Sequence, residues 1–198
     1  MRFPRLIVTL ALSFDMALHS AMATVVPANE LTRAVASTGA TSVQAANTDQ
    51  FLRAFGSVLI TKKARNYPTY VSAAVKLRKD LADKIVATTL TICRLNQPAS
   101  GKQFRLDAAK IVAAAVEANP DAAADIVRAA LLAEPESRDF IIAAAIKAAP
   151  EQRWAILDAA GEIMKTVSTT FFGPGNINPV DIGPEIRITS PEQPPRGP

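Results

Sequence analysis

The chain of 198 residues lacks most of the residue types on which catalysis and metal binding depend. It has one cysteine, Cys93, so a CxxC motif and an internal disulfide are both excluded. Its one histidine, His19, lies in a segment with the layout of an export signal, and the exported chain would have none. Ser-His-Asp catalysis, Cys-His catalysis and histidine metal sites are then excluded as well. Neither a P-loop nor a GxGxxG motif occurs. We therefore expect a protein that is not an enzyme and needs no cofactor.

Carboxylates are the remaining candidates for acid–base chemistry, and Glu134 and Glu136 form the closest pair. They flank Pro135 at an expected helix junction, where helix capping and the helix dipole explain acidic residues better. Aromatic residues are also scarce, at 6% of the chain. The core must therefore be packed from aliphatic side chains and alanine.

The sequence does contain a repeat of 15 residues between Ile111 and Ala160. An aliphatic pair recurs at one phase of this repeat, and a proline followed by an acid recurs at another. The pairs are Ile111-Val112, Ile126-Val127, Ile141-Ile142 and Ile156-Leu157, and the prolines are Pro120, Pro135 and Pro150. Proline is tolerated at the first position of a helix, and it pushes the preceding residue out of the helical region. Each proline is thus predicted to end one helix and to begin the next.

Weaker matches extend the repeat toward the amino terminus. Tyr70-Val71 and Ile85-Val86 keep the phase of the pairs, and Lys79-Asp80 takes the place of a proline and its acid. Six helical units are predicted between Pro68 and Met164, preceded by a helix over 49–61 with Thr48 as its N-cap. Because a helix of about 12 residues is marginal alone, the units must stack on one another. The predicted fold is all-α, with six or seven short helices in tandem 15-residue repeats that form a small α-solenoid or bundle with disordered termini.

Four segments follow from this pattern. Arg2 and Arg5, the apolar run of residues 6–14 and the small residues around Ala23 have the layout of a signal peptide over residues 1–23. The alternative for this segment is an ordinary buried helix. Residues 24–47 are expected to be flexible, and residues 48–166 form the repeat domain. Residues 167–198 are expected to be a disordered Pro-rich tail, either a spacer or a short motif for a partner's groove.

Units of the form Ile-Val-x-Ala-Ala-Ile-x-Ala-x-Pro-Glu resemble those of uncharacterised exported bacterial proteins that are rich in alanine. The resemblance rests on residues 111–160, with support from residues 70–94 and from the Pro-rich tail. It implies export and an all-α repeat fold, and it implies no activity. A location in the periplasm or outside the cell is expected after cleavage near Ala23, with no membrane span in the remaining chain.

Charge is distributed unevenly along the chain. Residues 51–110 carry a net charge of +9, whereas residues 111–165 carry −4. Such asymmetry is typical of an anion-binding surface or of head-to-tail self-association, and a solvated face is the plain alternative. Tyr67 and Tyr70 lie among the basic residues, where they could stack on bases or sugars. The densest basic group consists of Lys62, Lys63, Arg65, Lys76, Arg78 and Lys79.

Two interpretations of Cys93 stay open, a small buried hydrophobic residue or the site of an intermolecular disulfide. For the whole chain we expect an exported structural or interaction protein without enzyme activity. Its partner would be a protein, an envelope polymer or a second copy of the chain. The alternative is a module that uses residues 51–110 to bind an anionic envelope polymer, or nucleic acid if the chain is not exported.

Overall fold

The structure is a computed structural model of the chain, and it describes residues 26–96 and 101–171. All regular structure in these two ranges is helical, which confirms the all-α prediction. A helix over residues 26–36 comes first. The α-helices that follow are α2 (Thr48–Ile60), α3 (Tyr67–Leu77), α4 (Ala82–Asn96), α5 (Lys102–Ala118), α6 (Ala123–Ala133), α7 (Arg138–Ala148) and α8 (Arg153–Phe171). The six helices from α3 to α8 correspond to the six units predicted between Pro68 and Met164.

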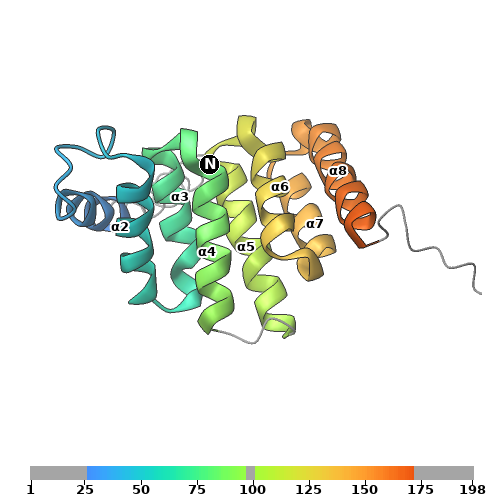
Figure 1. Cartoon of the computed structure of the whole chain (residues 1–198), viewed down its shortest axis with the longest axis horizontal. Helices are drawn as coiled ribbons and strands as arrows, with labels where there is room; N and C mark the ends of the chain where they lie inside the picture. Colours follow the sequence, from blue (N-terminus) through green and yellow to red (C-terminus); the bar gives the residue numbers. More distant parts are fainter. Residues whose placement is uncertain (1–25, 97–100, 172–198) are drawn as a thin grey trace, which may run out of the picture. The chain divides into compact units, whose positions relative to one another are not determined.

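The chain divides into two compact units, and the division falls inside α8, after Met164. Within the first unit, consecutive helices run in opposite directions and lie in two layers (Figure 1). α3, α5 and α7 pack against one another in one layer, and α2, α4 and α6 pack in the other. α8 adjoins α6, because Arg128 of α6 is ion-paired with Glu162 of α8 at 3.1 Å. The helices therefore stack as an open α-solenoid in which each helix contacts the helix two units further along.

The junctions between units share one backbone geometry. At the four junctions that follow α3, α5, α6 and α7, the last residue before the junction has φ between −149° and −138° and ψ between 71° and 80°. These residues are Arg78, Asn119, Glu134 and Ala149. The three residues that follow form a 3₁₀ turn, such as Pro120–Ala122, and the next α-helix begins directly after it. The prolines thus occupy the first position of a 3₁₀ turn and not, as predicted, the first position of the α-helix. Arg78 has the same backbone geometry as the residues before the prolines, and a 3₁₀ turn that begins with Lys79 follows it. This confirms that Lys79-Asp80 takes the place of a proline and its acid.

The core follows the aliphatic phase of the repeat. The first residue of each aliphatic pair is fully buried, and it lies one turn from a small residue that is buried as well. These isoleucines are Ile111, Ile126, Ile141 and Ile156. Phe51, Phe55, Tyr67 and Tyr70 fill the amino-terminal end of the core, where Phe51 and Phe55 stack with ring centroids 6.5 Å apart.

Residues 26–47 differ from the flexible segment that was expected. Residues 26–36 are helical, and Leu31 and Val35 of this helix belong to the core. The guanidinium of Arg78 donates hydrogen bonds to the carbonyl oxygens of Val43 (3.3 Å) and Ala46 (2.8 Å), which holds the following turns in place. The segment is ordered by contacts with residues more than 30 positions away, which a local pattern does not reveal.

Several predicted boundaries need small corrections. α2 is capped by Asn47 and not by Thr48, since the Asn47 side chain accepts a hydrogen bond from the Gln50 backbone N–H, and the Gln50 side chain accepts one from the Asn47 backbone N–H. The tail was predicted from residue 167, but α8 continues to Phe171. The signal peptide over 1–23 and residues 172–198 of the predicted tail lie outside the described residues. Within those that are described, no helix has the length and apolarity needed to cross a membrane.

Candidate functional site

The basic group that is dense in the sequence is divided in space by α3. Lys62, Lys63 and Arg65 precede this helix, whereas Lys76 lies in its last turn and is followed by Arg78 and Lys79. A helix of 11 residues is about 16 Å long, so the two halves of the group lie at opposite ends of α3. The six residues do not form one basic surface.

Two of the six are engaged within the chain. The ammonium of Lys62 lies 2.6 Å from Glu30, and the hydroxyl of Tyr70 donates to the same carboxylate at 2.6 Å. The hydrogen bond from Lys62 lowers the pKa of Glu30, and the same bond raises the pKa of Lys62, so both groups stay charged. Arg78 pairs with Asp80 at 2.7 Å in addition to its bonds to the turn of residues 43–46. Lys62 and Arg78 therefore fasten the amino-terminal segment to the array.

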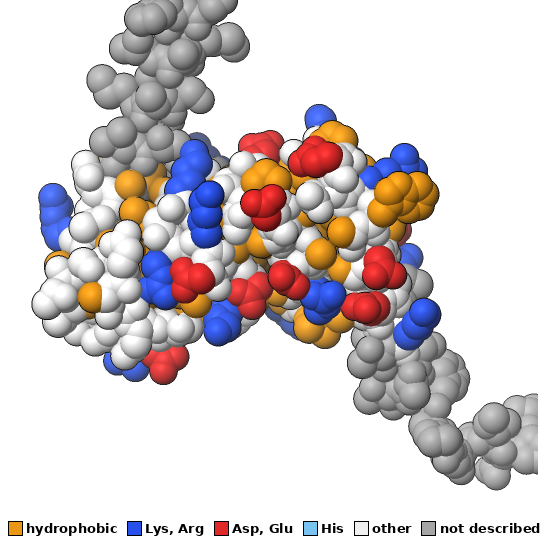
Figure 2. Space-filling model, turned by 90° about the horizontal axis from the view of Figure 1, so that it is seen from above, with side chains coloured by type: hydrophobic (Ala, Val, Ile, Leu, Met, Phe, Trp, Pro, Cys, Tyr) orange, Lys and Arg blue, Asp and Glu red, His pale blue; other side chains and the backbone are white. Residues whose placement is uncertain are grey.

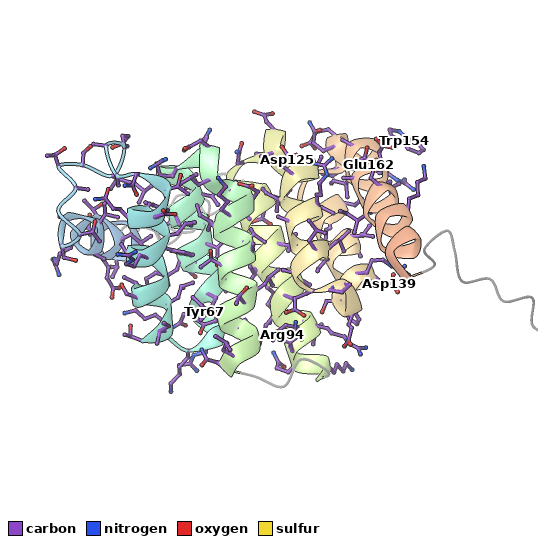
Figure 3. The ribbon with its side chains drawn as sticks, viewed as in Figure 1. Tyr67, Arg94, Asp125, Asp139, Trp154 and Glu162 are labelled. Atoms are coloured by element: carbon purple, nitrogen blue, oxygen red, sulfur yellow. The ribbon has the colours of Figure 1, made fainter. Side chains whose placement is uncertain are left out.

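The two tyrosines are also buried and do not offer their rings for stacking. Tyr67 is fully buried and its hydroxyl accepts a hydrogen bond from Asn96 at 3.0 Å, while Tyr70 is nearly so. Lys63 and Arg65 remain exposed at the end of the array where Tyr67 and Arg94 also lie (Figure 3). Lys76 and Lys79 are exposed as well, at the other end of α3, so anion binding stays a prediction for two separate pairs of exposed residues. Replacing both residues of a pair by alanine should weaken binding to a polyanion and flatten its salt dependence, and unchanged binding would rule that pair out.

Cys93 lies inside the core, fully buried in α4. Burial, helped by the nearby carboxylates of Asp107 and Glu134, raises the pKa of its thiol to about 11. A buried, protonated thiol is a poor nucleophile and cannot reach a second chain while α4 stays folded. The structure fits the interpretation of Cys93 as a small buried hydrophobic residue.

Glu134 is the most unusual carboxylate of the array, because it is only 3% exposed. Burial raises its pKa, and Arg94, 3.8 Å away, opposes this shift. It makes no side-chain capping bond, so the capping role expected from the sequence is not found. Glu136, by contrast, is exposed, and its charge adds to the rise in the pKa of Glu134. No three acidic, cysteine or histidine side chains gather as metal ligands in residues 26–96 and 101–171.

The surface that stands out lies at the carboxyl-terminal end of the array. The second residue of the aliphatic pair is buried in α5 and α6, half-buried in α7 and exposed in α8. These residues are Val112, Val127, Ile142 and Leu157. The inner helices are covered by the helix two units later, and α7 and α8 have no such helix among the described residues. Their outward side therefore keeps the apolar character of an internal contact without a neighbour.

We call this side the end face and define it by Ile142, Ile146, Trp154, Leu157 and Gly161. Trp154 is 78% exposed and Leu157 is 37% exposed. Trp154 points away from the array at the start of α8 (Figure 3), and apolar side chains lie at this end among charges of both signs (Figure 2). A hollow of about 610 Å³ is lined by Trp154, Ala155, Leu157 and Asp158.

Only part of the end face could be predicted from the sequence. The repeat places Leu157 at a buried position, and its exposure depends on the absence of a later unit. Trp154 takes the place of Ala109 and Ala124, where the inner helices have small residues. A large aromatic residue at an alanine position of the repeat is the signal that would have identified it.

Comparison of the chain with models of protein families, with curated proteins and with solved structures finds no match in any of the three.

Proposed function

We propose that the chain is an exported, non-enzymatic interaction protein that binds another protein through the end face. The observation that carries this proposal is the exposed indole of Trp154 beside Leu157, whose counterparts Val112 and Val127 are buried in α5 and α6. Tryptophan is enriched among the residues that dominate binding energies, and an apolar patch on an otherwise mixed surface is typical of a protein contact. The array acts as a rigid support for this patch.

The charge around the end face favours a protein over a polyanion. Arg153 and Asp158 lie in the same helix, one of each sign, and Arg138 is ion-paired with Asp139 at 3.1 Å in α7. A nucleic acid or an acidic polymer would be held by an excess of basic residues, and this end of the array has none. An apolar, neutral partner surface fits better.

Photochemical cross-linking in cells tests the proposal. A photoreactive residue is placed at Leu157 in the full chain, and the matched control carries it at Leu132, which is 61% exposed on α6 and not on the end face. A protein adduct at Leu157 and none at Leu132 is the expected result. If neither position gives an adduct, or both give the same one, the end face is not a binding site.

Export is the part of the proposal that rests on residues 1–23. Intact mass and cell fractionation test it directly: the expected product begins at Thr24 and is found in an exported fraction. A full-length product in the cytosol would contradict export without touching the end face.

A further inference from the structure

We propose that the partner of the end face is a second copy of the chain, packed with its α8 antiparallel to the first around a two-fold axis near Leu157. This inference rests on the proposed function and names its partner. Three features of the end face point to it: the exchange of a large and a small side chain along α8, the open space beside Gly161, and the polar cover at the other end of the array.

The first feature is a change of size at two register positions. α5 and α6 have alanine at one position and a larger aliphatic residue seven positions later, as in Ala124 and Leu131. α8 reverses this order, with Trp154 at the first position and Gly161 at the second. Residues seven apart lie on the same side of a helix, so the two are stacked on the end face about two turns apart.

This reversal makes α8 complementary to itself. When two copies of a helix pack antiparallel about a point between Leu157 and Asp158, residue 154 of one lies opposite residue 161 of the other. The indole of Trp154 then covers the partner's glycine, and the symmetry repeats the contact. Leu157 meets its own counterpart beside the axis.

The second feature is the space around Gly161. No described atom lies within 4 Å of the position that a Cβ would take there. Glycine inside a helix is less favourable than alanine, and no contact among the described residues requires it here. A closely approaching helix supplies a reason, because glycine lets the indole of a second copy sit against the backbone.

The third feature explains why association would stop at two copies. The amino-terminal end of the array is covered by residues 26–47, which place Leu31 and Val43 in the core and present exposed polar residues such as Arg33 and Gln44. Terminal units with a polar outer face are what close a solenoid to further stacking. Among the described residues, the end face is the uncovered end of the array, and a two-fold contact through it uses that surface on both chains. We therefore predict a closed dimer and not a filament.

The contact is small. An aromatic side chain buries roughly 150–250 Å², and even counted twice this stays below a standard protein interface. Asp158 also faces its own counterpart near the axis, and two like charges oppose association. We therefore expect a dimer with a dissociation constant on the order of micromolar.

Sedimentation velocity of the full chain over a range of concentrations tests the inference. The wild type is expected to shift from monomer to dimer and to form nothing larger. Leu157→Glu should weaken the dimer at least tenfold, and Asp158→Asn should strengthen it about three- to tenfold because the repulsion is removed. Leu132→Glu is the matched control, since Glu117 and Glu162 occupy the same register position, and it should leave the dimer unchanged.

A second variant guards against a folding defect. Gly161→Lys enters open space and raises helix propensity, so the chain should stay folded while the dimer weakens at least tenfold. A wild type that stays monomeric at all concentrations overturns the inference, as does a dimer that neither Leu157→Glu nor Gly161→Lys weakens. If cross-linking at Leu157 captures a different protein and the chain is monomeric, the dimer is wrong and the proposed function stands.

Discussion

Three leucines of the array offer a direct measure of which surfaces are covered. Leu131 and Leu132 are neighbours in α6, and their side chains are 2% and 61% exposed. Leu157 in α8 has an intermediate exposure of 37%. Leucine to alanine removes the same three carbon atoms at each position. The differences in the free energy of unfolding therefore report only how each side chain is surrounded.

The magnitudes follow from burial. A buried leucine loses about 0.8 kcal/mol for each carbon removed and leaves a cavity, so Leu131→Ala should cost about 2–5 kcal/mol. Leu132→Ala should change stability by less than about 0.5 kcal/mol, as is usual for an exposed position. Leu157→Ala should cost about 1 kcal/mol in dilute solution, because solvent already reaches this side chain and no closed cavity forms.

Urea unfolding followed by circular dichroism measures all three, provided that the slopes with denaturant agree. At higher protein concentration, the free energy of unfolding of the wild type should rise relative to that of Leu157→Ala. The reason is that only folded chains form the dimer, so association stabilises the folded state. A cost for Leu157→Ala equal to that for Leu131→Ala in dilute solution would refute the reasoning. It would show that the end face is already covered within a single chain.

Three further substitutions test other parts of the array. Arg78→Ala should cost about 1–3 kcal/mol, since the carbonyl oxygens of residues 43 and 46 lose their donor, and hydrogen exchange should accelerate there and not in α6. Glu134→Gln should stabilise the chain at neutral pH: burial raises the pKa of Glu134, so its ionised form opposes folding above about pH 4.3, and thermal unfolding should show the advantage disappear in acid. Ser137→Ala should raise the free energy of unfolding by up to about 1 kcal/mol, because the buried Ser137 hydroxyl has no hydrogen-bond partner among the described residues.

The repeat was predictable because its signals are local. A proline at fixed spacing restricts its own φ and the conformation of the residue before it, so helix ends follow from the sequence alone. The aliphatic phase then identifies the buried side, and all four isoleucines of that phase are indeed in the core. The 3₁₀ turn at each junction was missed, because a proline is compatible with the first position of either type of helix.

The basic group was misread as one surface because closeness in sequence is not closeness across a helix. Lys62 and Lys79 are 17 residues apart, and α3 between them places them at its opposite ends. The structural roles of Lys62 and Arg78 depend on Glu30 and on residues 43–46, far away in the sequence. A pattern of charge predicts the sign of a region and not the partner of each side chain.

The end face shows a different limit. Val127 and Leu157 have equivalent positions in the repeat, yet one is buried and the other exposed. Burial here depends on the presence of a later unit, so the same pattern has opposite outcomes at the middle and at the end of an array. The sequence carries the exception in Trp154 and Gly161, which reverse the sizes found in the inner helices.

The fluorescence of Trp154 reports directly whether the end face is exposed in a single chain and covered in a dimer, since the chain has no other tryptophan. In dilute solution we expect Trp154 to show the long-wavelength emission of an indole in water, and we expect a soluble quencher to reach it freely. On concentration, the emission should move to shorter wavelength and the quencher should lose access, and Leu157→Glu should abolish both changes. Emission that is already shielded in dilute solution and does not change with concentration would contradict the account.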